Sequence, residues 1–250
     1  QGSTIMMESQ IRLLARAVLS TRVMRNSSMA VPNLKTAPQR EETGLHCIQY
    51  KNEDPLSLFQ KWHKDFQTTS SKIVNNSLCL STASKNGIVS SRTLILRRLD
   101  KDGFVIMTDN RSRKSKELAE NPHASMVFLW NTINDDVVLS RQVRADGPVV
   151  VMEEDDMKEL YETEPLFCKI RAHICDQGKV VEWQEHKKNH DRVLQEFEDN
   201  RHQLERPPHI IAYKLIPNML EFYESLGPKI GDRIIFTKKD NLWELKRIMA

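Results

Sequence analysis

The segment Ser112 to Leu118 carries the pattern of residues that most suggests chemistry in this chain. Ser112 is a residue type that favours the position before a helix, yet the first turn that follows contains Arg113, Lys114 and Lys116. Cations are disfavoured there, because the helix dipole already places positive charge at that end. A bound anion would remove the conflict, since free backbone N–H groups and cations together form a phosphate site. The alternative is a solvated basic turn.

A further cation lies in the strand-like segment Ser91 to Arg98. Alternate residues of a strand share a face, so Arg92 is expected beside Leu94 and Leu96, with Arg97 on the opposite face. An arginine on an otherwise apolar face needs a partner. That partner is either a structural carboxylate, the commoner case, or a ligand phosphate.

The late segment 226–233 raises a similar question, because Lys229 and Arg233 flank Gly231 just before an apolar run. One explanation is an ordinary glycine-proline turn that enters a strand. The other is a loop whose basic residues reach a ligand.

The elements that would position these residues are mostly short strands separated by turns, a pattern typical of an antiparallel barrel or sandwich. Asn86-Gly87 is a strong hairpin signal, Asp146-Gly147-Pro148 is expected to be a turn, and 131–136 a longer surface loop. We expect a mainly β fold with peripheral helices. Strands are expected at 77–83, 89–98, 104–108, 125–130, 142–144, 149–151, 210–215, 219–223, 233–237 and 242–248, and helices at about 54–66, 113–120, 153–162 and 183–200.

The N-terminus differs from the rest of the chain. Between Met6 and Arg40 it carries five arginines and one lysine against one acid, Glu8, with apolar residues that could form an amphipathic helix. This composition resembles a mitochondrial presequence, and a disordered basic tail explains it equally well. We therefore expect residues 1–45 to be a leader and 46–250 to be one domain, in a cytoplasmic or mitochondrial protein.

Composition narrows the class of protein further. The net charge of +3 in 250 residues gives no reason to expect nucleic acid as the main partner. No apolar run approaches the roughly 18 residues that a membrane-spanning helix needs. The four cysteines form no CxxC pair and have no histidine at zinc-ligand spacing, so we expect free thiols and no metal site.

The order of motifs closely resembles the pyridoxine/pyridoxamine 5'-phosphate oxidase family from about Asp54 to the last residue. No single motif would suffice, and the set is specific. The matching motifs are Asn86-Gly87, Arg92 to Leu96, Lys101 to Phe104, Thr108, Ser112 to Lys114, Glu117-Leu118, Asn121-Pro122, Ala124-Ser125, Arg141 to Arg144, Gly147, Pro217, Glu221-Phe222, Asp232 to Ile234, Trp243 and Arg247.

The resemblance implies a split β-barrel that binds FMN at the interface of a homodimer. In that family the flavin takes a hydride equivalent from the 4'-carbon of pyridoxine or pyridoxamine 5'-phosphate, and oxygen then reoxidises it. The product is pyridoxal 5'-phosphate.

The resemblance also implies a largely retained flavin site. Two of its positions differ from the family pattern: Gly178 replaces a serine, and Tyr223 replaces a tryptophan, a mild change because both aromatics can stack and donate a hydrogen bond. The implied cofactor-binding residues are Arg92, Thr93, Leu94, Ile95, Met107, Thr108, Arg113, Lys114, Gln142, Gln177, Gly178, Tyr223 and Arg233.

The substrate side departs more strongly from the family. Arg97 corresponds to a lysine, which keeps the charge but not the shape. If Pro165 fixes the register, the family tyrosine, arginine and serine that hold the substrate phosphate correspond to Leu160, Glu164 and Cys168.

Three further positions complete the implied substrate site. Tyr161 is one residue from the expected tyrosine, so a shifted helix would restore the phenol, whereas nothing nearby in the sequence restores the arginine. Lys229 and Gly231 stand where the family has an arginine and a histidine. Hydrogen bonds to charged groups contribute roughly 1.5–3 kcal/mol each. Loss of three such contacts is therefore expected to weaken phosphate binding on the order of a thousandfold.

Three hypotheses follow. In the first, the chain is a working oxidase with an altered substrate pocket. In the second, it is a flavin-binding paralogue without this activity, which acts on another substrate or as a binding or regulatory protein. In the third, it is a split barrel that binds no flavin. The set of retained donors, Arg92, Arg113, Lys114, Gln142 and Arg233, argues against the third.

Overall fold

The computed structural model describes residues 44–51, 53–69, 76–134, 136–199, 201 and 203–250. These residues belong to one compact unit. Most of the expected leader, residues 1–43, lies outside the described residues, so the presequence and the basic tail both stay predictions.

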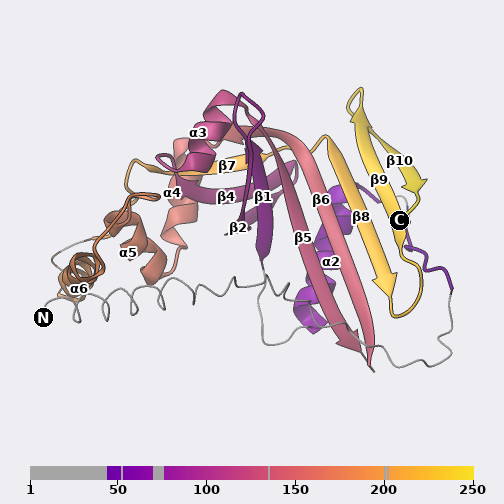
Figure 1. The fold of residues 1–250 in the computed structure, drawn as a ribbon, viewed down its shortest axis with the longest axis horizontal. Coiled ribbons are helices and arrows are strands. Elements are labelled where there is room, and N and C mark those ends of the chain that lie inside the picture. The colour runs from indigo at the N-terminus through magenta and orange to yellow at the C-terminus, as the bar shows by residue number, and fades with distance from the viewer. Residues whose placement is uncertain (1–43, 52, 70–75, 135, 200, 202) are drawn as a thin grey trace, which may run out of the picture. The chain divides into compact units, whose positions relative to one another are not determined.

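The described chain alternates strands with short helices (Figure 1). The helices are α2 (Pro55–Thr69), α3 (Arg113–Glu120), α4 (Glu154–Glu162), α5 (Leu166–Ile174) and α6 (Trp183–Glu198). The strands are β1 (Ser77–Ala83), β2 (Val89–Ile95), β3 (Arg98–Asp100), β4 (Gly103–Asp109), β5 (His123–Asn134), β6 (Val137–Val151), β7 (Ile210–Leu215), β8 (Met219–Leu226), β9 (Asp232–Lys239) and β10 (Leu242–Ile248). The mainly β architecture with peripheral helices is confirmed.

The strands pair antiparallel throughout, in the order β10-β9-β8-β6-β5-β1-β2. A second group, β3-β4-β7, joins this sheet where the last residues of β6 pair with β7. Helices α4, α5 and α6 gather near β4 and β7, while β8, β9 and β10 lie at the other edge of the sheet (Figure 1). The two ends of the sheet therefore have different surroundings.

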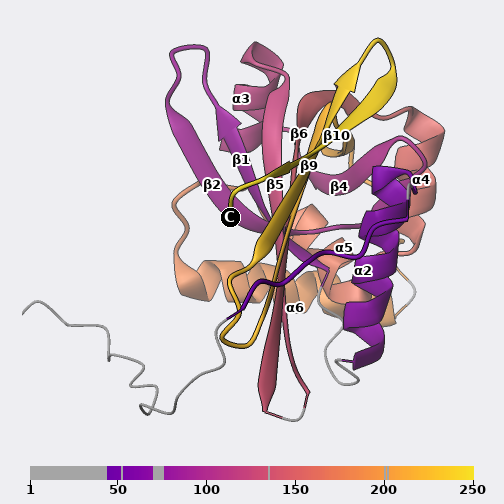
Figure 2. The same ribbon diagram turned by 90° about the vertical axis from the view of Figure 1, so that its right-hand side faces the viewer.

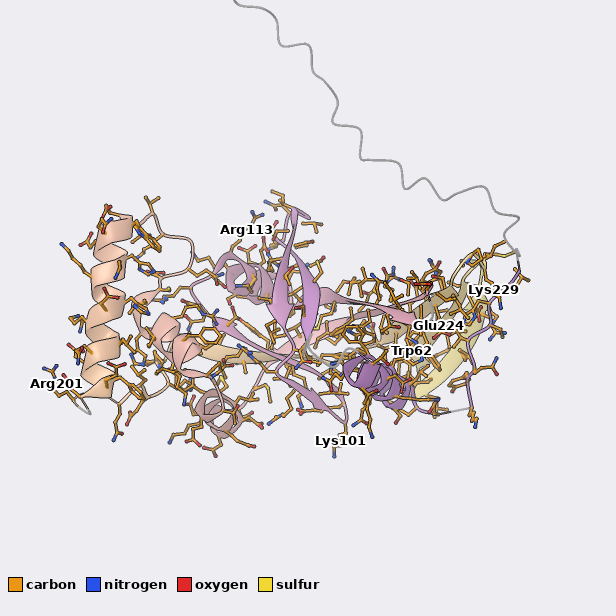
Figure 3. The ribbon with its side chains drawn as sticks, turned by 90° about the horizontal axis from the view of Figure 1, so that it is seen from below. Trp62, Lys101, Arg113, Arg201, Glu224 and Lys229 are labelled. Atoms are coloured by element: carbon orange, nitrogen blue, oxygen red, sulfur yellow. The ribbon has the colours of Figure 1, made fainter. Side chains whose placement is uncertain are left out.

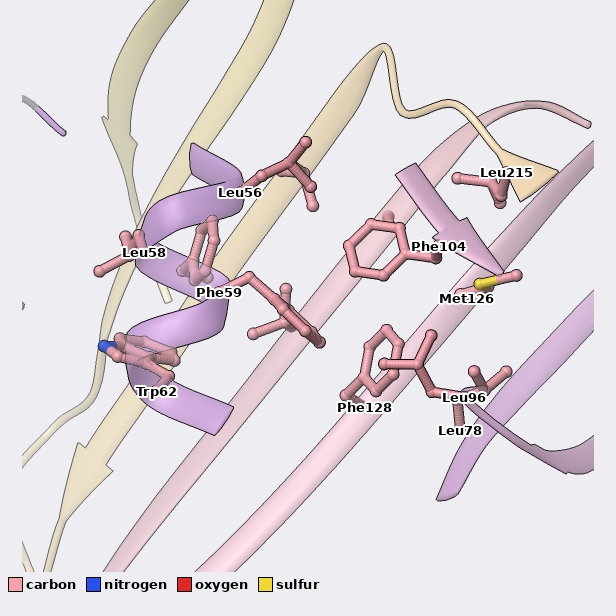
Figure 4. Close-up of a cluster of buried hydrophobic side chains, with 14 of the residues drawn as sticks. Leu56, Leu58, Phe59, Trp62, Leu78, Leu96, Phe104, Met126, Phe128 and Leu215 are labelled. Atoms are coloured by element: carbon pink, nitrogen blue, oxygen red, sulfur yellow. The ribbon is translucent and has the colours of Figure 1, made fainter. Parts of the chain in front are cut away.

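Helix α2 covers one face of the large sheet and fills the core (Figure 4). It begins as expected, because Asp54 Oδ2 accepts a hydrogen bond from Ser57 N at 3.1 Å and proline follows at the first helical position. Phe59 is fully buried, and its ring centroid lies 4.8 Å from those of both Phe104 and Phe128. The apolar stripe predicted for this helix is thus core.

The other face of the large sheet is more open. Thr93 and Ile95 on β2 are exposed, and Gln142, Tyr223 and Arg233 on β6, β8 and β9 are partly exposed. Register places all five on this face, opposite the residues that contact α2. Figure 2 shows α2 to one side of the strands.

Strand β6 corrects one prediction from the sequence. Residues 142–144 and 149–151 belong to one continuous strand, and Asp146-Gly147-Pro148 is not a turn. A Cβ atom on Gly147 would lie 2.2 Å from the carbonyl oxygen of Ile216, so the glycine allows a close backbone approach. The predicted surface loop at 131–136 is also wrong, because β5 and β6 stay paired up to Asn134 and Val137.

The expected strand from Val89 to Arg98 is interrupted. Strand β2 ends at Ile95, and the backbone then changes partner: Leu96 N donates to Asn76 O at 2.8 Å, and Arg97 N donates to Val105 O at 2.9 Å. The strict alternation predicted for Arg97 therefore fails. Its side chain faces the same cavity as Leu94.

Two further findings concern membrane-spanning helices and the cysteines. Among the described helices, none has the length and apolar character that crossing a membrane requires. All four cysteines are free thiols.

Candidate functional site

A cavity of about 560 Å³ lies where β4, α3, α4 and α5 meet the segment that leads into α6. Its wall is both apolar and charged, which suits an aromatic ligand with polar groups. Its lining includes Leu94, Arg97, Met107, Thr108, Lys114, Tyr161, Glu164, Cys168, Arg171, Gln177 and Gly178.

Lys114 is the buried cation of this cavity. Its side chain comes from the first turn of α3 and is 3% exposed. The ammonium donates hydrogen bonds to Thr108 Oγ1 at 3.0 Å, Ser112 Oγ at 3.2 Å and Gln177 Oε1 at 2.8 Å. It forms no ion pair with a carboxylate of the described residues. An anion in the cavity would supply the missing negative charge.

The pKa of Lys114 reflects this environment. Burial lowers the pKa to about 8, and the nearby charge of Arg92 acts in the same direction. Asp109 opposes this shift, while Arg171 adds to it. The charged form of Lys114 is therefore only moderately favoured over the neutral amine near neutral pH. An anionic ligand would raise the pKa of Lys114.

The start of α3 is free of a side-chain cap. Ser112 occupies the N-cap position, but its side chain makes no capping hydrogen bond and instead accepts one from Lys114 Nζ. Backbone N–H groups of a first helical turn need partners outside the helix. The buried lysine and the uncapped turn thus lie together at the start of α3, and the anion site that the sequence predicts there stays a prediction.

The other two cations expected at this site are held by Glu117. Arg113 Nε lies 2.7 Å from Glu117 Oε1, and Arg92 Nη2 lies 3.3 Å from Oε2. Burial opposes ionisation of Glu117, but hydrogen bonds from Thr82, Ser90 and Arg113 lower its pKa to about 2. Neither arginine lines the cavity. Arg92 has the structural carboxylate partner that the sequence offered as the alternative to a ligand, and Arg113 shares that carboxylate, a pairing that the sequence did not predict.

The proposed flavin residues form two groups in one chain. Six of the thirteen line the cavity: Leu94, Met107, Thr108, Lys114, Gln177 and Gly178. Arg92 and Arg113 pair with Glu117 and do not line the cavity. The other five, Thr93, Ile95, Gln142, Tyr223 and Arg233, lie on the open sheet face described above.

The second group is centred on a row of three neighbours. Gln142 pairs with Tyr223, and Tyr223 pairs with Arg233. The Arg233 guanidinium lies 5.4 Å from the centroid of the Tyr223 ring, and its buried Nε has no hydrogen-bond partner among the described residues. Arg233 Nη1 lies 3.9 Å from Glu221 Oε1, so Nε is the donor of this guanidinium that is left without a partner among the described residues.

The substrate residues expected from the sequence also divide. Arg97, Tyr161 and Cys168 line the cavity, whereas Lys229 and Gly231 belong to the β8–β9 connection. Figure 3 shows Arg113, at the start of α3, well separated from Lys229.

Glu164 occupies the position at which the family arginine was expected. Its Oε1 lies 2.7 Å from Arg97 Nε, so the two charges compensate each other. The side chain is buried, and its Oε2 makes no hydrogen bond to a described residue. An acid with a free oxygen therefore faces this end of the cavity.

Tyr161, and not Leu160, faces the cavity. Leu160 packs in a core cluster with Val105, Met157 and Ala212. Tyr161 is 3% exposed, and its hydroxyl makes no hydrogen bond to a described residue. Burial, with a smaller effect of Glu164, raises the pKa of Tyr161 to about 12, so the phenol stays protonated. Of the two registers left open by the sequence, the structure has the one that restores a phenol.

Gly231 has a packing role that the sequence did not predict. A Cβ atom at this position would lie 2.6 Å from the Tyr223 ring, so the absence of a side chain lets the ring lie against the backbone. Lys229 is exposed. The connection between β8 and β9 thus leaves room for the Tyr223 ring at Gly231.

Sequence reasoning missed Arg171. This exposed arginine lines the cavity from α5, a helix that was not predicted, and its Nη2 lies 3.6 Å from Cys168 Sγ. The basic residue type was visible, but the helix was not, because Pro165 and the apolar residues after it give no side-chain cap. A cation is therefore present near the position of the missing arginine.

Comparisons with known sequences agree on one family. The family model "Pyridoxamine 5'-phosphate oxidase" matches residues 73–198. A pyridoxine/pyridoxamine 5'-phosphate oxidase of Paraburkholderia phymatum is 31% identical over 217 residues, which cover 85% of this chain and 97% of that protein. A pyridoxine-5'-phosphate oxidase of Bos taurus is 30% identical over 198 residues, or 79% of this chain and 71% of the relative.

Solved structures share the fold. PhzG from Burkholderia lata, in complex with tetrahydrophenazine-1-carboxylic acid, has a TM-score of 0.70 and 23% identity, covering 79% of this chain and 93% of its own. A pyridoxamine 5'-phosphate oxidase-related, FMN-binding protein from Nostoc punctiforme has a TM-score of 0.62 and 16% identity, covering 80% and 100%. The expected split-barrel fold is confirmed.

Proposed function

The chain belongs to the pyridoxamine 5'-phosphate oxidase family, and we propose that it is an FMN-dependent oxidase of vitamin B6 compounds. The observation that carries this proposal is Lys114, a buried ammonium without a carboxylate partner, in a cavity lined by five other proposed flavin residues. Relatives of the chain are named pyridoxine/pyridoxamine 5'-phosphate oxidases.

The donor set of the cavity fits FMN. Lys114 and the uncapped first turn of α3 would hold the flavin phosphate, and Gln177 and Thr108 already fix the lysine by hydrogen bonds. Leu94 and Met107 supply apolar wall that keeps water away from an aromatic ring. When bound, FMN would accept a hydride equivalent from the substrate carbon and pass the electrons to oxygen.

We propose a homodimer in which each flavin site draws on both copies. The two groups of flavin residues lie on different parts of one chain, and the second lies on an open sheet face. That face carries the free donor Arg233 Nε and exposed apolar side chains such as Leu129, at 55%. A second copy on this face would cover the apolar surface and could bring Gln142, Tyr223 and Arg233 to its partner's cavity.

The second candidate is a flavin-binding protein without this oxidase activity. Glu164 favours it, because a buried acid next to Arg97 opposes a phosphate dianion. Tyr161 favours the oxidase, because it supplies a protonated phenol at the same wall. FMN binding is common to both candidates, so the two differ only in turnover.

The experiment starts from the purified protein with added FMN. A yellow protein with a flavin spectrum is expected, and the Lys114→Ala variant should lose flavin, whereas Lys116→Ala, an exposed lysine of the same helix, should retain it. Pyridoxamine and its 5'-phosphate are then added in air, and aldehyde product is measured. Aldehyde formation with either compound supports the oxidase. A yellow protein inert to both supports the second candidate, and a protein that takes up no FMN contradicts both.

A further inference from the structure

Two buried polar atoms at one end of the cavity make no hydrogen bond to any described residue. They are Tyr161 Oη, at the end of α4, and Glu164 Oε2, in the turn before α5. Glu164 N donates a hydrogen bond to the Tyr161 carbonyl oxygen at 3.1 Å, which closes the turn between the two residues. Both residues line the cavity. The wall at this end of the cavity therefore contains an unpaired acceptor and an unpaired phenol.

The charge at this end does not favour an anion. Arg97 is already paired with Glu164 Oε1 at 2.7 Å, so its charge is compensated. Burial, and then a hydrogen bond with Glu164, raise the pKa of the Cys168 thiol, which keeps that side chain neutral. Arg171 also lines the cavity and is exposed, and Lys169 Nζ lies 5.8 Å from the centroid of the Tyr161 ring. Arg97 and Glu164 thus balance each other's charge, and Glu164 Oε2 is left as an unpaired carboxylate oxygen.

Hydrogen-bond chemistry then selects the ligand group. A buried carboxylate oxygen without a partner is unfavourable, and a ligand that donates to it restores the lost interaction. A phosphate dianion carries only acceptors, so it can take a hydrogen bond from Tyr161 but is repelled by Glu164. A hydroxyl group can do both, since it donates to the carboxylate and accepts from the phenol. An ammonium group can donate to the carboxylate.

We propose that this end of the cavity binds a hydroxyl or ammonium group, so that the preferred substrate is an unphosphorylated B6 vitamer such as pyridoxamine. This inference rests on the proposed function, since it assigns the substrate class of the same site. The 5'-hydroxymethyl group of pyridoxamine would lie against Glu164 and Tyr161 in place of the phosphate ester. Arg97 then acts as a positioning residue that holds the carboxylate.

The test measures binding by calorimetric titration with pyridoxamine and with pyridoxamine 5'-phosphate. The wild-type protein, loaded with FMN, is expected to bind pyridoxamine at least about tenfold more tightly than the phosphate ester. Glu164→Gln, which keeps the shape and removes the charge, should lower that preference about tenfold. Glu164→Arg should reverse it. Glu162→Gln, an exposed glutamate of the same segment, is the matched control and should change nothing.

Opposite results would overturn the inference. If the phosphate ester binds more tightly, and Arg171→Ala removes that preference, the exposed arginine is the anion site and the acid is not selective. Equal binding of both ligands, binding of neither, or a preference unchanged in Glu164→Gln also contradicts it. The titration needs no turnover, and the flavin spectrum is recorded separately. A protein that binds no FMN therefore contradicts the proposed function, while its titration in the flavin-free form still tests the ligand preference.

Discussion

The charges of this site differ in whether they are free to meet a ligand. Arg92 and Arg113 share the carboxylate of Glu117, whereas Lys114 has only neutral hydrogen-bond partners. The energetic requirement for an anion in the cavity is therefore concentrated at one buried ammonium. Removing that charge should affect flavin binding more than removing either arginine.

The affinity for FMN should depend on pH through Lys114. Its pKa is about 8 without ligand, and a bound phosphate raises it, so the affinity should fall as the pH rises above about 8. Below about 6 the flavin phosphate loses a charge, so binding should be tightest between these limits. Lys114→Met should weaken binding about 10–100-fold at pH 7 and remove the decline above pH 8. Fluorescence titration of FMN across this range checks both effects.

Two matched results are needed for that assignment. Lys116→Met should keep the wild-type pH profile, because this lysine is exposed on the same helix. A decline above pH 8 that persists in Lys114→Met would assign the titration to another group and contradict the role of this lysine.

The role of a single residue was predictable where its neighbours in the sequence determine its environment. Lys114 followed from a helix start that is crowded with cations, a conflict visible in the sequence. The partners of Arg92 and Arg113 were not predictable, because β1, β2 and α3 must fold together before Glu117 reaches both. The open choice between Leu160 and Tyr161 depended on the orientation of α4, which tertiary packing sets.

At the scale of elements, hairpins and helices that begin after a residue type favoured at the N-cap were the predictable part. Helix α3 and strands β1, β7 and β10 have the predicted bounds, and α2 has the predicted cap. Strand β6 was divided in the prediction, because Gly147-Pro148 signals a turn when only local sequence is considered. In the fold this glycine passes close to the backbone of Ile216, a contact between segments far apart in the chain. Such tertiary contacts leave no local pattern.

The close approach at Gly147 predicts a specific loss of stability. Gly147→Ala would place a Cβ atom 2.2 Å from the Ile216 carbonyl oxygen, so either β6 or the β7–β8 connection must shift. We expect the free energy of unfolding to fall by about 1–3 kcal/mol, as for other overpacked sites. Gly44→Ala is the control, because its nearest neighbour is the Lys229 Cγ at 3.9 Å, and it should change stability by less than about 0.5 kcal/mol. Equal unfolding midpoints for the two variants in denaturant titrations would refute the steric explanation.

At the scale of the whole molecule, the two groups of proposed flavin residues need an explanation together. Lys114 and Gln177 line the cavity, whereas Gln142, Tyr223 and Arg233 form a row on the open sheet face. If both groups bind one FMN, a single chain provides two incomplete halves, and a symmetric pair of chains provides two complete sites. Dimerisation would then be a requirement for flavin binding as well as a way to cover apolar surface.

Mixing two variants that each bind FMN weakly tests whether each flavin site is built from two chains. Lys114→Met and Arg233→Met should each bind FMN weakly, and each mixed dimer should contain one site with both residues intact and one with neither. After random exchange of subunits, about a quarter of all sites should bind FMN with wild-type affinity. A mixture of Lys114→Met with Gln177→Ala is the control and should show no recovery, because both residues come from the same chain's cavity. Absence of recovery in the first mixture, in protein shown by light scattering to be dimeric, would mean that each flavin site is built from one chain.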